Sequence, residues 1–236
     1  MKSAPDKLIT ISDPESPTAE AYRTLRTNIL FSSLDSPLRT LLVASPGPDE
    51  GKSIVLCNLA VTMAQAGSRV VVVDCDLRRP SIHNLFNLAN DKGLATALIA
   101  DADTDLPLQP TPIPNLRVLT AGPVPPNPSD LLGTHRLQRV IQAISALADL
   151  ALFDAPPVGY LADAAILGAK LDGAVLVVSA GKTRREVALR AKTLLEKANI
   201  RLLGVVLDNA QLDADLYKVL GGRPSRSWFP LFKKQN

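Results

Sequence analysis

The residues best suited to chemistry form a stretch rich in glycine and proline, Ser45–Ser53, which follows an apolar run. The stretch ends in Gly51, Lys52 and Ser53, where a strand is expected to give way to a helix. Backbone amides at a helix start bind phosphate oxygens, a lysine reaches the outer phosphates, and a serine hydroxyl can hold Mg²⁺. The strict phosphate-loop pattern has glycine five residues before Gly51, where this sequence has Pro46. A chance Gly-Lys-Ser at a helix start is the alternative, and the strand–loop–helix context argues against it.

Carboxylates follow two further apolar runs. Asp74 and Asp76 come after four valines, and Asp154 comes after Leu-Ala-Leu-Phe. Because residues i and i+2 of an extended chain point to the same side, Asp74 and Asp76 would face whatever lies beyond the strand end. Beside a phosphate loop, that object is Mg²⁺, an attacking hydroxyl group or both. Solvated acids paired with Arg78 and Arg79 are the alternative. An aspartate after an apolar strand, as at Asp154, is typical of the Walker B motif, which holds the metal, often through water.

The elements that must position these groups are apolar strands that alternate with amphipathic helices. The expected strands are 41–44, 70–73, 116–119, 150–153, 174–178 and 202–207, and the expected helices include 17–31, 51–66, 129–147 and 183–198. Such an alternation predicts a mostly parallel sheet that is covered by helices on both faces. A fold of this kind binds ligands beyond the carboxyl ends of its strands. We therefore predict an α/β fold, a single P-loop NTPase domain.

The composition fits one packed domain and excludes several classes of protein. Of the 236 residues, 46% are apolar and 21% are charged, which excludes a disordered chain. No run of 18 apolar residues occurs, so no membrane span is expected. Two cysteines, Cys57 and Cys75, indicate free thiols in a reducing cytoplasm. The net charge is +3, and the residues after 216 include five basic and no acidic residues. The main domain therefore lacks the basic excess that is typical of a nucleic-acid-binding protein.

The chain divides into three parts. We expect a flexible lead-in over residues 1–15, the P-loop domain over 16–220 and a basic aromatic tail over 221–236. Within the domain, 16–33 form an N-terminal helix. Tryptophan and phenylalanine beside basic residues in the tail suit an anionic membrane surface. A disordered tail, or one that folds back on the domain, is the alternative.

The motifs at the strand ends resemble those of the bacterial tyrosine kinases of capsule and exopolysaccharide synthesis, the CpsD/CapB type. That family's first motif reads Ser-x-x-Pro-x-x-Gly-Lys-Ser, which Ser45–Ser53 satisfies. Its second motif, Asp-x-Asp-x-Arg, matches Asp74–Arg78, and its third, Asp-x-Pro-Pro, matches Asp154–Pro157. The stretch Ala121–Pro128 matches the family's Ala-Gly-Pro-x-Pro-Pro-Asn-Pro. The resemblance covers roughly residues 14–210 and implies a MinD/ParA-like fold.

The resemblance also implies roles for individual residues, with ATP and Mg²⁺ as cofactors. Asp74 would take the proton from a substrate tyrosine, with Lys52 as the second catalytic residue. Ser53, Asp76 and Asp154 would hold Mg²⁺, although the residues alone do not show which of the three acids is the base. In the family an asparagine near the end of the last strand contacts adenine, and here that strand ends in Asp208-Asn209, so the adenine contact stays open. The expected nucleotide-binding set is Gly47, Pro48, Asp49, Glu50, Gly51, Lys52, Ser53, Ile54, Asp208 and Asn209.

The N-terminal helix carries Glu20, Arg23 and Arg26 at spacings of three. Spacing alone indicates one solvated flank of a helix. In the family this pattern forms subunit contacts in a ring-shaped oligomer, for which arginine is suited because it pairs with carboxylates in a bidentate manner. The resemblance therefore implies a homo-oligomeric ring with this helix at the interface.

The tyrosines depart from the family pattern. Many members end in a cluster of tyrosines that become phosphorylated, whereas this sequence has three tyrosines in all, Tyr22, Tyr160 and Tyr217. Tyr217 alone lies near the end, so it is the candidate phosphorylation site there.

Two functions of different classes fit these motifs. The resemblance implies an ATP-dependent protein-tyrosine kinase of a capsular or exopolysaccharide system. The missing tyrosine cluster favours a nucleotide-switched ATPase or assembly module that regulates a membrane polysaccharide co-polymerase. A DNA-partitioning ATPase is less favoured, because that group places a lysine where this chain has Gly47. The resemblance further implies a membrane-embedded co-polymerase or activator as partner, no nucleic-acid partner, and a cytoplasmic location at the inner face of the plasma membrane.

Overall fold

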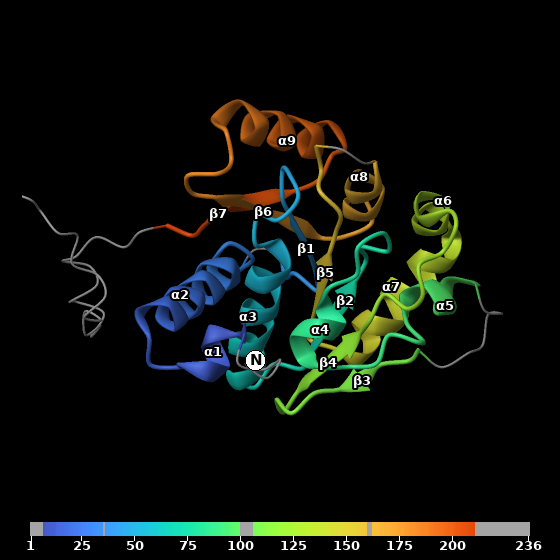
Figure 1. Ribbon diagram of the computed structural model, residues 1–236, viewed down its shortest axis with the longest axis horizontal. Helices are drawn as coiled ribbons and strands as arrows, with labels where there is room; N and C mark the ends of the chain where they lie inside the picture. The colour runs from blue at the N-terminus through green and yellow to red at the C-terminus, as the bar shows by residue number, and fades with distance from the viewer. Residues whose placement is uncertain (1–6, 35, 100–105, 160–161, 211–236) are drawn as a thin grey trace, which may run out of the picture.

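A computed structural model describes residues 7–34, 36–99, 106–159 and 162–210. Its centre is a seven-stranded sheet in the order β3-β4-β2-β5-β1-β6-β7 (Figure 1). The strands are β1 (Thr40–Ala44), β2 (Val70–Asp74), β3 (Gln109–Pro110), β4 (Leu116–Leu119), β5 (Leu150–Asp154), β6 (Gly173–Ser179) and β7 (Leu202–Asp208). Neighbouring strands run parallel, except that β3 pairs antiparallel with β4 at the edge. The predicted α/β fold with a mostly parallel sheet is confirmed.

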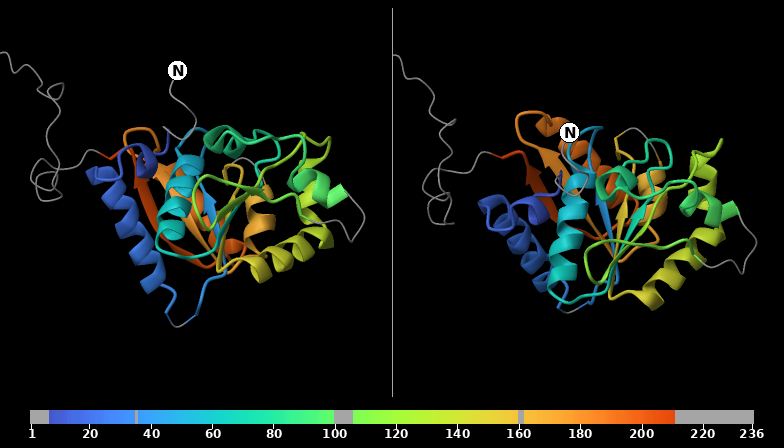
Figure 2. Two further views of the ribbon diagram at one scale, coloured as in Figure 1. Left: turned by 90° about the horizontal axis from the view of Figure 1, so that it is seen from below. Right: turned by 60° about the horizontal axis from the view of Figure 1, so that its bottom comes forward.

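Helices cover both faces of the sheet, and each face has its own hydrophobic cluster. One face carries α1 (Ile9–Ser12), α2 (Pro17–Phe31), α3 (Lys52–Gln65) and α4 (Ile82–Phe86). The other carries α5 (Leu94–Ile99), α6 (Pro128–Gly133), α7 (His135–Leu147), α8 (Asp163–Gly168) and α9 (Arg185–Lys197). Figure 2 shows α2 and α3, in blue and cyan, on one side of the sheet and α7, in yellow, on the other. Because both faces are covered, β1, β2 and β5 are buried from end to end.

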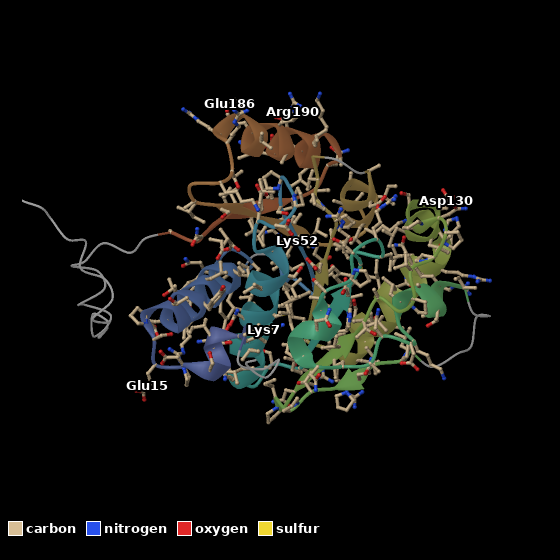
Figure 3. The ribbon with its side chains drawn as sticks, in the orientation of Figure 1. Lys7, Glu15, Lys52, Asp130, Glu186 and Arg190 are labelled. Carbon is tan, nitrogen blue, oxygen red and sulfur yellow. The ribbon has the colours of Figure 1, made fainter. Side chains whose placement is uncertain are left out.

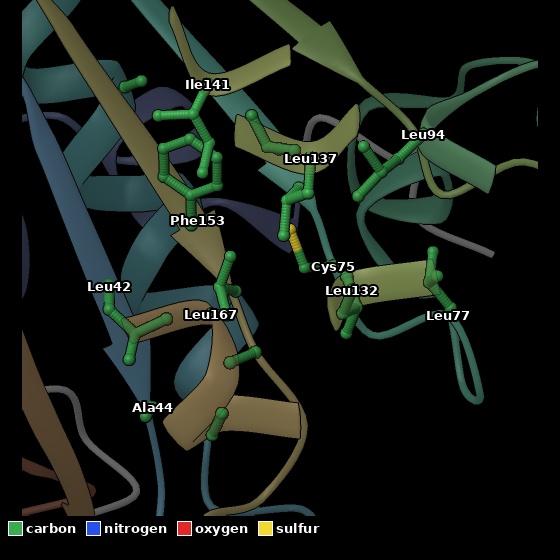
Figure 4. Packing of buried hydrophobic residues seen from close by; sticks show 14 of the residues in the cluster. Leu42, Ala44, Cys75, Leu77, Leu94, Leu132, Leu137, Ile141, Phe153 and Leu167 are labelled. Atoms are coloured by element: carbon green, nitrogen blue, oxygen red, sulfur yellow. The ribbon is translucent and has the colours of Figure 1, made fainter. Parts of the chain in front are cut away.

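Side-chain shape explains the central elements. β2 begins with four valines, each at most 3% exposed, and β-branched side chains favour a strand. The helix α3 is buried throughout 55–64, so it is a central helix whose start faces the carboxyl ends of the strands. At α2, the Ser16 side chain accepts a backbone N–H and Pro17 takes the first helical position. On the other face, Phe153 of β5 lies beside Ile141 of α7 (Figure 4).

The first described residues, 7–15, differ from the flexible lead-in that the sequence suggested. Leu8 is fully buried, and the next residues form the short helix α1. The amide and the hydroxyl of Thr10 both donate to Oδ1 of Asn58, over 3.1 and 2.8 Å. Asn58 lies on the buried helix α3, and a buried side-chain amide needs hydrogen-bond partners. The lead-in supplies those partners, which is why it packs against the domain.

Two further details differ from the sequence-based expectation. The helix predicted over 129–147 is divided into α6 and α7 at Thr134, which is extended at φ −70° and ψ 155°. The Thr134 hydroxyl donates to the carbonyl of Leu131 over 2.7 Å, and this bond favours an end to α6. The two-residue strand β3 lies within the segment expected to be a loop, where Pro110 is compatible only with an edge.

Three elements of the sequence-based prediction lie outside the described residues. They are the tail 221–236, Tyr160 and Tyr217. None of the helices in the described part of the chain has the length and apolar character that a membrane span requires.

Candidate functional site

The carboxyl ends of β1, β5 and β2 meet because these three strands are neighbours in the sheet. Lys52, at the start of α3 in the middle of Figure 3, extends its Nζ to within 3.0 Å of Asp154 Oδ1 and 3.3 Å of Asp76 Oδ2. The Ser53 hydroxyl donates to Oδ2 of Asp154 over 2.6 Å. Asp74 is paired with Asp154 in the register of β2 and β5. The structure thus brings together residues from all three predicted motifs.

The phosphate loop turns sharply before α3. Asp49 and Gly51 both have positive φ, 55° and 82°. The carboxylate of Asp208, at the end of β7, leaves no room for a Cβ on Gly51, so glycine is required there. The turn presents the amides and the dipole of α3, both of which favour a phosphate group. Asp208 therefore lies on the phosphate loop, whereas the adjacent Asn209 is exposed.

The charges at this site are buried and paired. Lys52 is 9% exposed. Burial lowers the pKa of its amine, but Asp154 and Asp76 together raise it more, so the pKa of Lys52 lies above its ordinary value. Burial raises the pKa of Asp154, although Lys52 and the Ser53 hydroxyl act in the opposite direction. A charged lysine between two carboxylates is the arrangement expected at neutral pH, because a buried charge without a partner is costly.

Asp74 and Asp76 have different surroundings, although the sequence suggested that they point the same way. Asp74 is fully buried, and its Oδ2 accepts the amides of Ser81 and Ile82 over 3.0 Å each. Its Oδ1 accepts the amide of Asp76 over 3.2 Å. Burial, followed by the charge of Asp154, raises the pKa of Asp74 to about 7. Asp74 therefore holds the segment that follows β2, and Asp76 faces the site.

A pocket of about 580 Å³ opens at these strand ends. One part is lined by Pro48–Ile54, which are seven of the expected nucleotide-binding residues. Another part is lined by Arg78, Arg79, Ser81 and Leu85 after β2, and by Pro156 and Pro157 after β5. Asp76 also lines the pocket, whereas Asp74 and Gly47 do not. The pocket therefore extends beyond the phosphate loop to the segments that follow β2 and β5.

Two residues that sequence reasoning missed hold the phosphate loop from outside. The Thr183 hydroxyl donates to Oε1 of Glu50 over 2.6 Å, while Oε2 of Glu50 accepts the Gly47 amide over 2.7 Å. Lys182 Nζ donates to the carbonyl of Asp49 over 2.5 Å. Lys182 and Thr183 follow β6, so the rule that functional residues stand after strands could have found them.

The donor set at Ser53, Asp76 and Asp154 fits Mg²⁺. Magnesium prefers oxygen ligands and is commonly held by one or two carboxylates together with substrate phosphates and water. Here one hydroxyl and two carboxylates surround the ammonium group of Lys52, so the site already accommodates a cation. Within the described residues, no group of three or more His, Cys, Asp or Glu side chains could hold a metal by itself. Phosphate oxygens would have to complete the coordination.

The charged pattern on α2 makes contacts within the chain. Arg23 pairs with Glu20 over 2.6 Å and also donates to the carbonyl of Pro14. Arg26 donates to the carbonyl of Thr62, near the end of α3, over 2.9 Å. The three residues are therefore neither unpaired nor fully solvated, and their role between subunits stays a prediction.

Comparisons with known proteins agree with these motifs. The ParA family model, described as "NUBPL iron-transfer P-loop NTPase", matches residues 38–214. The tyrosine-protein kinase YwqD of Bacillus subtilis is 40% identical over 205 residues, which are 87% of this chain and 86% of that protein. The putative tyrosine-protein kinase CapB of Staphylococcus aureus is 35% identical over 212 residues, which are 90% of this chain and 93% of that protein.

A solved structure extends the likeness to three dimensions. The kinase domain of the Escherichia coli tyrosine kinase ETK superposes with a TM-score of 0.83 at 30% sequence identity. The match covers 88% of this chain and 81% of that domain. With the ParA-type match, the three motifs and the parallel sheet, these likenesses show that the chain belongs to the bacterial tyrosine kinase family of P-loop NTPases.

Proposed function

We propose that this chain transfers the γ-phosphoryl group of ATP to tyrosine residues of proteins in a capsular or exopolysaccharide system. The observation that carries the proposal is the convergence of Lys52, Asp76 and Asp154 at a pocket of about 580 Å³ that extends from the phosphate loop to the segments after β2 and β5. The names of the relatives, tyrosine-protein kinases of two different bacteria, support the same activity.

The residues of the site divide the work of phosphoryl transfer. Backbone amides at the start of α3 bind the phosphates, and the ammonium group of Lys52 stabilises the charge on the transferred group. Ser53, Asp76 and Asp154 would hold Mg²⁺, which would neutralise phosphate charge when bound. The tyrosine oxygen bonds to the γ-phosphorus while the bond to the bridging oxygen of ADP breaks. Positioning and electrostatics supply most of the rate in such a reaction.

The proton of the tyrosine hydroxyl goes to Asp74 in this proposal, as the family resemblance implies. Asp74 has the pKa, raised to about 7, that suits a base near neutral pH. Asp74 is fully buried and does not line the pocket, so the segment after β2 would have to move for an acceptor tyrosine to reach its carboxylate. Asp76, which already lines the pocket, is the other carboxylate within the same segment.

Assembly and location belong to the proposal as well. Glu20, Arg23 and Arg26 would contact a second copy of the chain in a ring. A membrane-embedded co-polymerase or activator would be the partner, and the chain would lie in the cytoplasm at the inner face of the plasma membrane. The basic aromatic tail would contact that membrane surface.

A nucleotide-switched assembly module is the second candidate. The observation that favours it is the scarcity of acceptor tyrosines, since the sequence has three and Tyr22 is only 9% exposed. A DNA-partitioning role is disfavoured because that group of ATPases places a lysine where this chain has Gly47.

The deciding experiment follows γ-labelled ATP with Mg²⁺ on the purified protein, with Lys52→Met as the control. Free phosphate and phosphotyrosine are counted in the same tube, and mass spectrometry maps the labelled residue. Phosphotyrosine that is absent from the Lys52→Met sample supports the kinase. Free phosphate without phosphotyrosine, also after the membrane activator is added, supports the switch. Full activity in Lys52→Met with an unchanged circular dichroism spectrum would contradict the site itself.

A further inference from the structure

The part of the pocket away from the phosphate loop carries positive charge. Its charged side chains are those of Arg78 and Arg79, and its apolar surface comes from Leu85 and the two prolines after β5. This part follows β2 and β5, whereas Asp208, which contacts the phosphate loop, is the last residue of β7, on the opposite side of β1 in the sheet. In the sequence, Asp76 comes after the phosphate loop and before the two arginines. Its Oδ2 lies 3.3 Å from Lys52 Nζ. An acceptor that approaches the phosphates from this side passes both guanidinium groups.

Arg78 is held in place by a closed set of hydrogen bonds. Its Nε donates to Oδ2 of Asp163 over 3.1 Å, and its Nη2 donates to the Ser129 hydroxyl over 2.8 Å. Ser129 in turn donates to Oδ1 of Asp163 over 2.5 Å. Asp163 is fully buried at the start of α8, while the Arg78 side chain is 38% exposed. Fixing two nitrogens of a planar guanidinium orients the third, and Nη1 has no hydrogen-bond partner among the described residues.

Arg79 adds an uncompensated charge. Its amide donates to Oδ1 of Asp76 over 3.1 Å, which fixes the backbone, and its side chain is exposed. The guanidinium forms no ion pair with any residue in the described part of the chain. Arg78 is neutralised in part by Asp163, so the net charge of this part of the pocket comes mainly from Arg79.

We propose that Arg78 and Arg79 select acceptor tyrosines that have acidic residues close by in the sequence. This inference rests on the proposed kinase function and names its acceptor class. The apolar surface of Leu85 and the prolines suits an aromatic ring, and the two guanidinium groups suit carboxylates beside it. The chain itself contains such a sequence, because Asp213 and Asp215 precede Tyr217 with no basic residue between them.

The test compares two peptides with the full-length protein, Mg²⁺ and γ-labelled ATP. One peptide has the sequence of residues 211–222, and the other carries Asp213→Asn and Asp215→Asn. The wild type is expected to prefer the acidic peptide about fivefold in kcat/KM through a lower KM, as a few exposed charge pairs would give. The preference should disappear in 0.5 M salt, since such pairs are screened.

Enzyme variants assign the preference to the two arginines. Because Arg78 remains, Arg79→Gln should reduce the preference for the acidic peptide without abolishing it, while Arg117→Gln, which changes an exposed arginine on β4, should keep the preference of the wild type. Ser129→Ala and Asp163→Asn test the positioning of Arg78. Both should raise the KM for the acidic peptide more than for the Asn peptide, whereas a merely structural role would lower kcat alike for both.

Each outcome bears on one conclusion. Equal phosphorylation of the two peptides by the wild type overturns the acceptor class and leaves the kinase intact. A preference that is as large in Arg79→Gln as in the wild type overturns the role of that arginine. Absence of phosphotyrosine from both peptides and from the protein itself overturns the kinase function and the acceptor class together.

Discussion

The hydroxyl of Thr183 donates a hydrogen bond of 2.6 Å to Oε1 of Glu50, and this contact ties the loop after β6 to the phosphate loop. Thr183 also accepts the amide of Ser179 over 2.8 Å, so its side chain connects the end of β6 with the nucleotide site. Glu50 is 5% exposed, and among the described residues its carboxylate accepts one other hydrogen bond, from the Gly47 amide. The hydrogen bond from Thr183 is therefore important for the conformation of the loop.

Thr183→Val should weaken both the fold and nucleotide binding. Removing a hydrogen bond to a buried carboxylate costs about 1.5–3 kcal/mol of unfolding free energy, and we expect the Kd for ATP to rise about threefold to tenfold. Denaturant unfolding and titration with a fluorescent ATP analogue measure the two effects. Thr183→Ser, which keeps a hydroxyl, should retain the unfolding free energy and the Kd for ATP of the wild type. Thr193→Val, which removes a hydroxyl that bonds only within α9, is the matched control and should bind ATP as the wild type does. An unchanged Kd in Thr183→Val would contradict the role of this contact.

Asp74 should make stability depend on pH. Its pKa rises from 3.8 to about 7 on folding, chiefly through burial. Between these two values the native state binds more protons than the unfolded state, so the unfolding free energy falls as the pH rises and becomes level above about pH 7. The total change is on the order of a few kcal/mol. Urea unfolding of the nucleotide-free protein at several pH values between 4.5 and 8 measures the slope.

The control for this pH dependence is a change at the same carboxyl group. Asp74→Asn removes the titration, so its unfolding free energy should vary less over that range. Asp130→Asn, on the exposed surface of α6, should keep the slope of the wild type. If Asp74→Asn and the wild type had equal slopes, burial would not be controlling the proton of Asp74.

Much of the site could be predicted because apolar runs define strands and the residue after each run stands at a carboxyl end. In a parallel sheet these ends share one edge, so Lys52, Asp76 and Asp154 could be grouped from their positions in the sequence. The same rule fails for Asp74 and Asp76. Asp74 is the last residue of β2 and Asp76 lies in the turn beyond it, where the alternation of an extended chain no longer holds.

Strand order could not be predicted, and the contacts that depend on it were missed. Thr183 reaches Glu50 because β6 lies next to β1, although more than 120 residues separate them in the sequence. Arg78 meets Asp163 because the segments after β2 and β5 lie side by side. The lead-in was expected to be flexible, yet Leu8 is fully buried and Thr10 forms hydrogen bonds with Asn58 on the central helix α3.

Ser53→Ala should reduce the part of nucleotide affinity that depends on magnesium. The hydroxyl donates to Asp154 over 2.6 Å and belongs to the proposed metal ligands. In EDTA the variant and the wild type should bind ATP with similar Kd. Adding Mg²⁺ should lower the Kd for ATP of the wild type by a factor about tenfold larger than the factor for the variant. Ser53→Thr, which keeps a hydroxyl, should behave as the wild type. Calorimetric titration with and without Mg²⁺ measures the difference, and an equal gain in both proteins would exclude Ser53 from the metal site.

Replacing Glu20, Arg23 and Arg26 together by alanine should give a smaller particle. The triple variant removes the charges that the ring interface would use, and light scattering with Mg²⁺-ATP present measures the mass. Loss of the Arg26 bond to Thr62 should also lower the unfolding free energy by about 1 kcal/mol, which leaves the domain folded.

The matched control for this prediction removes an ion pair of the same kind from another helix. Lys192 pairs with Glu196 on the exposed surface of α9 over 3.5 Å. Replacing both by alanine should leave the mass of the particle unchanged, because α9 covers the opposite face of the sheet from α2. An assembled wild type whose mass is the same in the triple variant would refute the interface, and so would a wild type that stays monomeric with Mg²⁺-ATP. A mass that falls in both variants would show instead that assembly depends on surface charge in general, and the specific role of α2 would be lost.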